Sequence, residues 1–298
     1  MKRALMTYNR RLRIIGFLFV LPAVLYFALI YYFPLLRSFD LSFREVLPDG
    51  ARPYVGLDTY RDVLADPLFW TSARNTVLFT FLSVLLIVVL GLVIAVALYT
   101  LGSEPMRNFY TVFYVLPTLV SFAAAGSIWE WIYHSQFGLA NTVLMAIGLP
   151  RMKFLNDAAQ VIPSLAIIQF WVRVGFAVLI IMAGLQSISS SFFDAAKVDG
   201  ASGFRLHWHI TLPMVLPQVA VVSLLEVIMG FRVFDVIYIT TQGGPATSSY
   251  MLLLFFYDNA FRFYRQDRAS VIAVMMFLVL LAFSIIQRRV MGGKRREI

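Results

Sequence analysis

Five charged side chains lie within long apolar stretches of the sequence. They are Glu130, Arg173, Glu226, Arg232 and Asp235. An ionisable side chain at the centre of a lipid bilayer costs about 2.5–3.5 kcal/mol on insertion scales, so each of these residues requires a partner or water. Arg232 and Asp235 are three residues apart and would share one face of a helix, which predicts an intramembrane ion pair.

Four side chains in the apolar stretches, and Asn141 in the loop at 133–160, could contact a polar solute. The candidates for such a substrate path are Trp171, Arg173, Glu226, Tyr238 and Asn141. Two readings stay open for the charged members of this set. They could line a path for the solute, or they could pair between helices and fix the bundle.

The sequence lacks the residue patterns of common catalytic and metal sites. It contains no cysteine, which excludes disulfides, thiolate metal sites and cysteine nucleophiles. Its three histidines include His207 and His209, which would point to opposite sides of a helix, so we expect no metal site. There is no phosphate-binding G-x-x-x-x-G-K-[ST] loop and no H-E-x-x-H or G-x-S-x-G motif. We therefore expect a chain that is not an enzyme, has no catalytic residues and binds no cofactor of its own.

The composition of the 298 residues predicts a membrane protein, since 60% are hydrophobic and only 14% are charged, whereas about 25% are charged in an average soluble domain. A helix needs about 20 apolar residues to cross the hydrocarbon core. The first apolar stretch ends in Tyr31, Tyr32 and Phe33 rather than in small residues, which indicates a retained anchor and not a cleaved signal peptide. The predicted spans are Ile14–Phe33, Thr76–Leu98, Phe109–Ile132, Val161–Leu185, Leu216–Thr240 and Ala269–Gln287.

The net charge of +9 is distributed unevenly between the two sides of these spans. Residues 1–13, 99–108, 186–215 and 288–298 carry 13 basic and four acidic residues, whereas the alternate loops 34–75, 133–160 and 241–268 carry 10 and nine. Lys and Arg next to spans favour the cytoplasmic side. Both termini are therefore expected in the cytoplasm. A nucleic-acid surface is not expected, because the basic residues are not interleaved with aromatic residues on one face.

The loop at residues 186–215, here called the coupling segment, reads as two short helices outside the lipid. Ser191 followed by Asp194 resembles a capping box, which predicts a helix start at Ser191. Gly200 and Gly203 supply a helix stop and a turn, and a second helix would begin near Phe204. Local chemistry leaves two interpretations open: the helix rests on lipid headgroups, or it docks on another protein.

The coupling segment resembles the EAA loop of binding-protein-dependent ABC importer permeases, whose pattern is E-A-A-x-x-D-G-A followed by I-x-L-P. This sequence reads Asp194-Ala195-Ala196-x-x-Asp199-Gly200-Ala201 and then Ile210-x-Leu212-Pro213. Asp194 replaces the usual Glu, and His207 stands where the pattern usually has Phe. The resemblance implies that residues 194–196 and 199–201 couple the chain to a separate ATPase, which binds the ATP and Mg²⁺.

Two further segments resemble the carbohydrate-uptake group of these permeases, similar to maltose and glycerol-3-phosphate permeases. Gly56-Leu57-Asp58-Thr59-Tyr60 resembles its G-L-x-N-Y motif. The run from Phe231 to Pro245 resembles its F-x-x-F-D…T-x-G-G-P motif. The resemblance extends over residues 14–287 and implies four kinds of partner: a second permease subunit in a heterodimer, two ATPase copies, an extracytoplasmic solute-binding protein and a sugar-like solute.

The sequence as a whole predicts an all-α membrane protein of six transmembrane helices with a coupling helix between spans four and five. We expect a cytoplasmic N-terminus at 1–13, a permease domain at 14–287 and a cytoplasmic C-terminus at 288–298, in a multi-pass protein of the cell's inner membrane. The predicted function is the permease subunit of an ATP-driven sugar importer. The alternatives are an importer permease for a non-sugar solute, a self-contained secondary transporter, for which no inverted repeat or interrupted helix is evident, and a non-transporting membrane scaffold.

Overall fold

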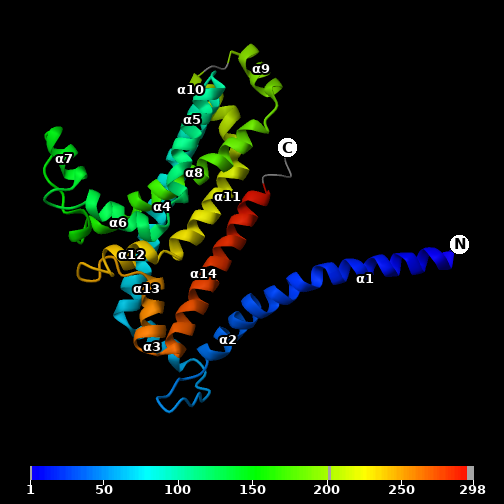
Figure 1. The fold of residues 1–298 in the computed structure, drawn as a ribbon, viewed down its shortest axis with the longest axis vertical. Helices are drawn as coiled ribbons and strands as arrows, with labels where there is room; N and C mark the ends of the chain where they lie inside the picture. Colours follow the sequence, from blue (N-terminus) through cyan, green and yellow to red (C-terminus); the bar gives the residue numbers. More distant parts are fainter. Residues whose placement is uncertain (1, 201–202, 294–298) are drawn as a thin grey trace. The chain divides into compact units, whose positions relative to one another are not determined.

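The computed structural model describes residues 2–200 and 203–293. This part of the chain is almost entirely helical, and its only strand-like pairing is a bridge between Arg44 and Tyr54. The predicted all-α fold class is confirmed. The α-helices, all labelled in Figure 1, are α1 (Lys2–Phe27), α2 (Phe33–Ser42), α3 (Asp58–Ala65), α4 (Pro67–Thr100), α5 (Glu104–Val115), α6 (Phe122–Ile132), α7 (Leu139–Ala146), α8 (Val161–Gln186), α9 (Ser190–Val198), α10 (Gly203–Leu206), α11 (Leu212–Phe231), α12 (Asp235–Thr240), α13 (Leu252–Tyr257) and α14 (Gln266–Gly293).

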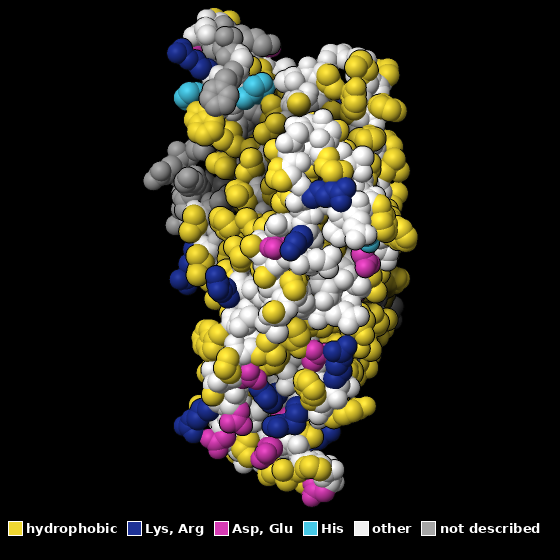
Figure 2. All heavy atoms as spheres, turned by 90° about the vertical axis from the view of Figure 1, so that its left-hand side faces the viewer, with side chains coloured by type: hydrophobic (Ala, Val, Ile, Leu, Met, Phe, Trp, Pro, Cys, Tyr) yellow, Lys and Arg dark blue, Asp and Glu magenta, His cyan; other side chains and the backbone are white. Residues whose placement is uncertain are grey.

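Five helical segments are long and apolar enough to cross a membrane, and a sixth candidate is a bent pair of helices. These segments overlap the six predicted spans in sequence. Apolar side chains dominate the face drawn in Figure 2, as expected for a surface in contact with lipid or with a partner chain. The five segments are Leu12–Ser42, Pro67–Thr100, Val161–Gln186, His207–Thr240 and Gln266–Val290, and the bent pair is Glu104–Leu119 with Phe122–Ile132.

The third span differs from the unbroken helix predicted over Phe109–Ile132. It bends by 101° between Leu119 and Phe122, where the hydroxyl of Ser121 accepts a hydrogen bond from the backbone N–H of Ala124 at 3.2 Å and caps the new helix. The expectation that no helix is interrupted was therefore wrong. A run of apolar residues does not reveal such a bend, because the bend is held by contacts with another helix.

Helix α8 supplies those contacts. The hydroxyl of Thr118 donates a hydrogen bond to the backbone carbonyl of Val172 at 2.9 Å. At Gly175 a Cβ atom would overlap the backbone of Tyr114, so only glycine permits this close approach. Of the candidate spans, α8 has the largest buried share, 61% of its most apolar window. It is the central helix of the unit to which it belongs.

The described helices divide into two compact units, one formed by Met1–Ala65 with Asn259–Met275 and the other by Asp66–Asp258 with Met276–Ile298. The core of the second unit consists of two apolar clusters, which include Leu165 and Ile237 in one and Ile181 and Val222 in the other. The candidate path residues and the described coupling residues all lie in this second unit.

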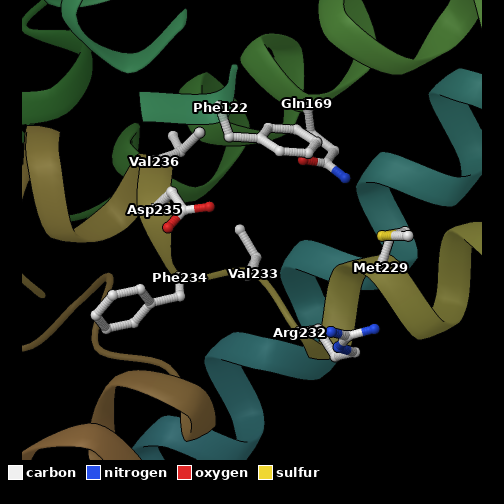
Figure 3. Close-up of a pocket in the computed structure, with 8 residues that line it drawn as sticks. All are labelled: Phe122, Gln169, Met229, Arg232, Val233, Phe234, Asp235 and Val236. Atoms are coloured by element: carbon white, nitrogen blue, oxygen red, sulfur yellow. The ribbon is translucent and has the colours of Figure 1, made fainter. Parts of the chain in front are cut away.

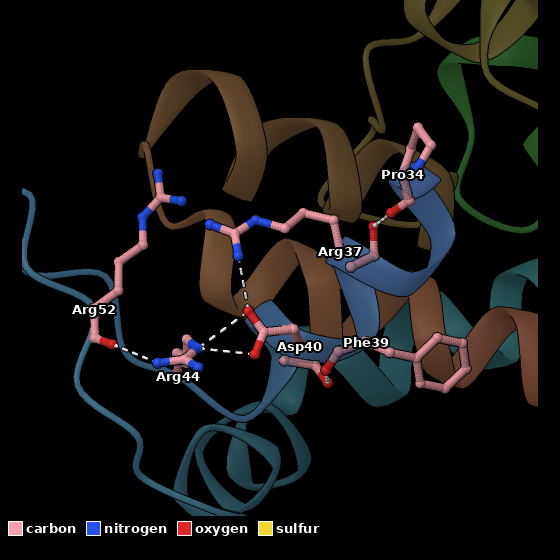
Figure 4. A network of polar contacts seen from close by, with 8 residues as sticks. Pro34, Arg37, Phe39, Asp40, Arg44 and Arg52 are labelled. Atoms are coloured by element: carbon pink, nitrogen blue, oxygen red, sulfur yellow. Dashed lines mark hydrogen bonds and ion pairs between the residues drawn. The ribbon is translucent and has the colours of Figure 1, made fainter. Parts of the chain in front are cut away.

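The first unit contains the loop predicted on the outer side of the membrane. The first helical segment continues through a π-helical turn to Ser42, beyond the Phe33 expected from the sequence. Arg37 and Arg44 both bind the carboxylate of Asp40, at 2.9 and 3.0 Å, and Arg44 also reaches the backbone carbonyl of Arg52 (Figure 4). This network ties the end of the helix to the loop that follows it.

A second ion pair in the same unit lies just before α14. Arg265 binds the buried carboxylate of Asp267 through Nε and Nη2, the latter at 2.9 Å. The hydrogen bonds that Arg265 donates to the carboxylate of Asp267 raise the pKa of Arg265 above its ordinary value. The ion pair fixes the start of α14, because Asp267 lies in the first turn of that helix.

Candidate functional site

The intramembrane charges form one ion pair that local spacing did not predict. Nε of Arg173 on α8 donates to both carboxylate oxygens of Glu226 on α11 at 3.1 and 3.2 Å, and Nη2 donates to Oε1 at 2.6 Å. The exposed fractions of the two side chains are 12% and 1%. The guanidinium also lies over the ring of Phe176, 4.6 Å from its centroid, which is a cation–π contact. Arg173 and Glu226 thus neutralise each other, whereas Glu130 is exposed.

The predicted ion pair between Arg232 and Asp235 is wrong. Helix α11 ends at Phe231, and Asp235 is the first residue of α12, so the two residues do not share one helix. Both are exposed, and no ion pair joins them. Spacing of three residues brings side chains together only on a continuous helix, and the non-helical backbone at Phe234 breaks that continuity.

Two helix breaks line one cavity of about 180 Å³ (Figure 3). One break is the bend before α6, which contributes Phe122, and the other is the interruption between α11 and α12. Non-helical backbone at membrane depth is tolerated only where it is buried in protein or lines a cavity. We call this space the break cavity. Its lining residues are Phe122, Gln169, Met229, Arg232, Val233, Phe234, Asp235 and Val236.

The break cavity combines aromatic and polar side chains. Figure 3 places the amide of Gln169 beside the ring of Phe122, while Arg232 and Asp235 lie apart, on either side of Val233. A ring, an amide and separate charges of both signs can together bind the hydroxyl groups and the apolar face of a polar organic solute. Sequence reasoning missed Phe122 and Gln169, because neither is charged and neither belongs to a motif.

The other candidate path residues have different surroundings. Tyr238 lies one helical turn after Asp235, and its ring contacts those of Phe234 and Tyr257 at centroid distances of 5.1 and 5.6 Å. Trp171 is half-buried and meets Trp129 edge-on at 6.0 Å. Of these rings only that of Phe234 lines the break cavity; neither Tyr238 nor Trp171 does.

Asn141 holds a loop together. Its side chain is fully buried, its amide nitrogen donates to the carbonyls of Ser135 and Met152 at 3.1 and 2.9 Å, and its oxygen accepts from the backbone N–H of Met152 at 2.9 Å. This residue is not brought together with Arg173 or Glu226, and it does not line the break cavity. Its hydrogen bonds connect the start of α7 to the chain that follows it.

The coupling segment contains the two short helices expected from the sequence. Helix α9 is followed by Gly200 with φ +82°, and α10 begins at Gly203 with φ +52°, so both glycines adopt the left-handed conformation that a turn requires. Helix α9 begins at Ser190, however, and the hydroxyl of Ser189 accepts the backbone N–H of Ser191 at 3.4 Å. The predicted cap at Ser191 is therefore wrong, and Ser189 occupies the capping position.

Helix α9 presents an accessible surface. Asp194, Ala195, Asp199 and Gly200 are exposed, whereas Ala196 is buried. The ring of Phe193 lies 6.0 Å from that of Tyr99 at the end of α4, which holds the helix against the bundle. Of the predicted coupling residues, Ala201 lies outside the described part of the chain.

Comparison with known proteins decides the family. Residues 87–296 match the family described as "Binding-protein-dependent transport system inner membrane component". The chain belongs to this family. It is 34% identical over 288 residues to the trehalose/maltose transport system permease protein MalF of Thermococcus litoralis, with 95% of each chain covered. It is 31% identical over 286 residues to the sulfoquinovosyl glycerol transport system permease protein SmoG of Agrobacterium fabrum, covering 95% of this chain and 92% of the relative.

A solved structure has the same fold. A chain of a bacterial alginate ABC transporter, crystallised with an alginate pentasaccharide-bound periplasmic protein, matches with a TM-score of 0.79 and 22% identity over 95% of both chains. The predicted resemblance is thus confirmed, and the chain is a multi-pass membrane protein of a transport system. Membership of this family argues against a self-contained secondary transporter and against a non-transporting scaffold.

Proposed function

We propose that this chain is the transmembrane permease subunit of an ATP-driven ABC importer for a sugar or a sugar-like solute. The observation that carries the proposal is the 34% identity, over nearly the full length of both chains, with a trehalose/maltose transport system permease protein. The coupling segment supports it, because the exposed helix α9 is followed directly by a tight turn at Gly200, and a short helix joined by a tight turn transmits a displacement with little slack. Solute import is then driven by ATP hydrolysis elsewhere in the complex.

The proposed partners follow from the same role. The chain pairs with a second permease subunit, each bound to one copy of an ATPase that holds ATP and Mg²⁺, and an extracytoplasmic binding protein delivers the solute. The chain itself supplies no catalytic residue and no cofactor. We place it in the inner, cytoplasmic membrane with both termini in the cytoplasm, since the positive charges concentrate on that side. Residues 14–287 form the permease domain and 194–196 with 199–201 contact the ATPase.

We place the solute path at the break cavity and at the nearby aromatic residues Trp171 and Tyr238. A sugar offers hydroxyl groups to Gln169, Arg232 and Asp235 and a C–H face to the ring of Phe122. The volume of about 180 Å³ is below the 300–1,000 Å³ of most small-molecule sites. A second permease subunit that completes the cavity accounts for this small size.

Site variants in the complete complex test this proposal. The complex is purified through a tag on this chain, and ATP hydrolysis is measured with the binding protein and with and without sugar. We expect Phe122→Ala and Asp235→Asn to raise the sugar concentration needed for half-maximal stimulation. The control is Asp58→Asn. Asp58 forms an exposed ion pair with Arg61, and the exposed fractions of the side chains are 66% for Asp58 and 78% for Arg61. Equal responses in all three variants would place the solute elsewhere.

The alternative, a permease for a non-sugar solute, makes a different prediction in the same assay. An amino acid or a small ion with its own binding protein would then stimulate ATP hydrolysis, while a panel of neutral disaccharides would not. The same purification also tests the partners, since the proposed complex contains an ATPase and a second permease chain. A tagged chain that purifies alone and without ATPase activity would contradict the assembly.

A further inference from the structure

The ion pair between Arg173 and Glu226 joins the two helices on either side of the coupling segment. We propose that this pair, here called the brace, makes α8, the coupling segment and α11 move as one rigid hairpin. Its two members are then positioning residues that convert displacement of α9 into movement of the spans. The inference rests on the proposed function and assigns a new role to two of the candidate path residues.

The register of the two helices gives the brace its position. Arg173 is 13 residues before Gln186, the end of α8, and Glu226 is 14 residues after Leu212, the start of α11. At 1.5 Å per residue each member lies about 20 Å along its helix from that helix end. The hairpin is therefore closed at its base by the chain and again about 20 Å away by the ion pair.

A second contact fastens the same helices near the base. At Gly184 an added Cβ atom would come within 2.6 Å of the side chain of Gln218. This packing holds α8 and α11 together close to the coupling segment, but it resists sliding only through van der Waals contact. The brace also resists sliding through directional contacts. Three hydrogen bonds between the planar guanidinium of Arg173 and the carboxylate of Glu226 fix the distance and the relative orientation of the two groups.

The burial of Glu226 favours a brace over contact with solute. Its side chain is 1% exposed, and both carboxylate oxygens accept hydrogen bonds from Arg173. Phe176 supports the guanidinium through its ring face. Apolar residues could join two helices in lipid without the cost of burying charge, but they would not fix the register of the helices as this ion pair does.

The test measures coupling, which a merely structural role would not change. The complete complex is reconstituted, and solute imported per ATP hydrolysed is determined for the wild type, Arg173→Lys, Arg173→Gln and Glu226→Gln. Lys keeps the charge but loses the two-pronged geometry. We expect all three variants to lower this ratio by about fivefold or more, the range of a typical coupling free energy, and the control Asp58→Asn to leave it unchanged.

The outcomes separate the brace from its alternatives. The brace is overturned if Arg173→Lys and at least one of the neutral variants, Arg173→Gln or Glu226→Gln, each import as much solute per ATP hydrolysed as the wild type. A changed half-saturating solute concentration with an unchanged ratio assigns the pair to solute contact, which also overturns it. A wild-type complex in which sugar stimulates no ATP hydrolysis rejects the proposed function instead, and the two failures are thereby distinguished.

A distance measurement tests the hairpin without reference to any solute. The chain has no cysteine, so spin labels at the exposed positions Ser190→Cys and Val221→Cys report one distance between α9 and α11. We expect a narrow distance distribution in the full chain and a broader one when Glu226→Gln is added. Identical distributions would overturn the brace even if a variant complex fails to assemble.

Discussion

Arg173→Met removes one partner of the ion pair and leaves the Glu226 carboxylate, which is 1% exposed, without its guanidinium. Breaking a buried pair in this way costs about 3–5 kcal/mol in the free energy of unfolding. The position of Arg173 is 12% exposed, so water can enter the space that the guanidinium leaves beside Glu226, and we expect about 3 kcal/mol, the low end of that range. The mirror change, Glu226→Met, leaves an unpaired guanidinium and should cost a similar amount.

The double variant makes this prediction specific. Replacing a buried ion pair by apolar side chains of similar volume is often neutral, so Arg173→Met with Glu226→Met should recover most of the loss of either single change. The midpoint of thermal unfolding in detergent is the assay. For a domain of 150–250 residues about 1 kcal/mol corresponds to roughly 2–4 °C, so each single variant should unfold about 6–12 °C below the wild type.

The control is Asp58→Asn, which breaks an exposed pair on α3 with side-chain exposures of 78% and 66%. Exposed pairs contribute about 0–1 kcal/mol, so its midpoint should stay close to that of the wild type. The reasoning is refuted if both single Met variants unfold at the wild-type temperature, or if the double variant is as unstable as the sum of the two single changes.

Three further changes test other parts of the account. A proline at position 200 cannot adopt φ +82°. Gly200→Pro should therefore abolish sugar-dependent ATP hydrolysis while the chain still inserts in the membrane, as measured by fractionation. Full stimulation of ATP hydrolysis by sugar would contradict the role of the turn. Exchanging Arg232 and Asp235 should impair uptake as strongly as removing either charge, since they do not pair, and restored uptake in the exchange would contradict this. Gly175→Val should prevent the bend of the third span from seating on α8, because a Cβ atom there overlaps the backbone of Tyr114, and a normal yield of folded protein would be inconsistent with that contact.

The sequence predicted the spans and the coupling turn because both depend on local chemistry. Long apolar runs specify helices in lipid, and Gly200 and Gly203 supply the left-handed backbone that a turn needs. The bend of the third span depends instead on α8, through Thr118 and Gly175. Pro117 and Ser121 within this stretch are local signals of a helix break and a new helix start, but they specify neither the angle of the bend nor the helix against which it packs.

The charges in the spans show the same division. Helical spacing suggested a pair between Arg232 and Asp235, but the helix ends between them. Glu226 and Arg173 are 53 residues apart in the chain, so no periodicity connects them. What the sequence did indicate correctly was that buried charges require partners, and the packing of α8 against α11 determines which partner each one has.

Uptake into proteoliposomes measures sugar import by the complete complex. The complete complex is reconstituted with ATP and Mg²⁺ inside the vesicles and the binding protein outside, and a panel of labelled neutral disaccharides is compared with labelled amino acids. The account predicts that one or more of the sugars accumulates inside, and only when both ATP and the binding protein are present. Accumulation that proceeds without ATP, or that occurs for amino acids and for none of the sugars, would contradict it.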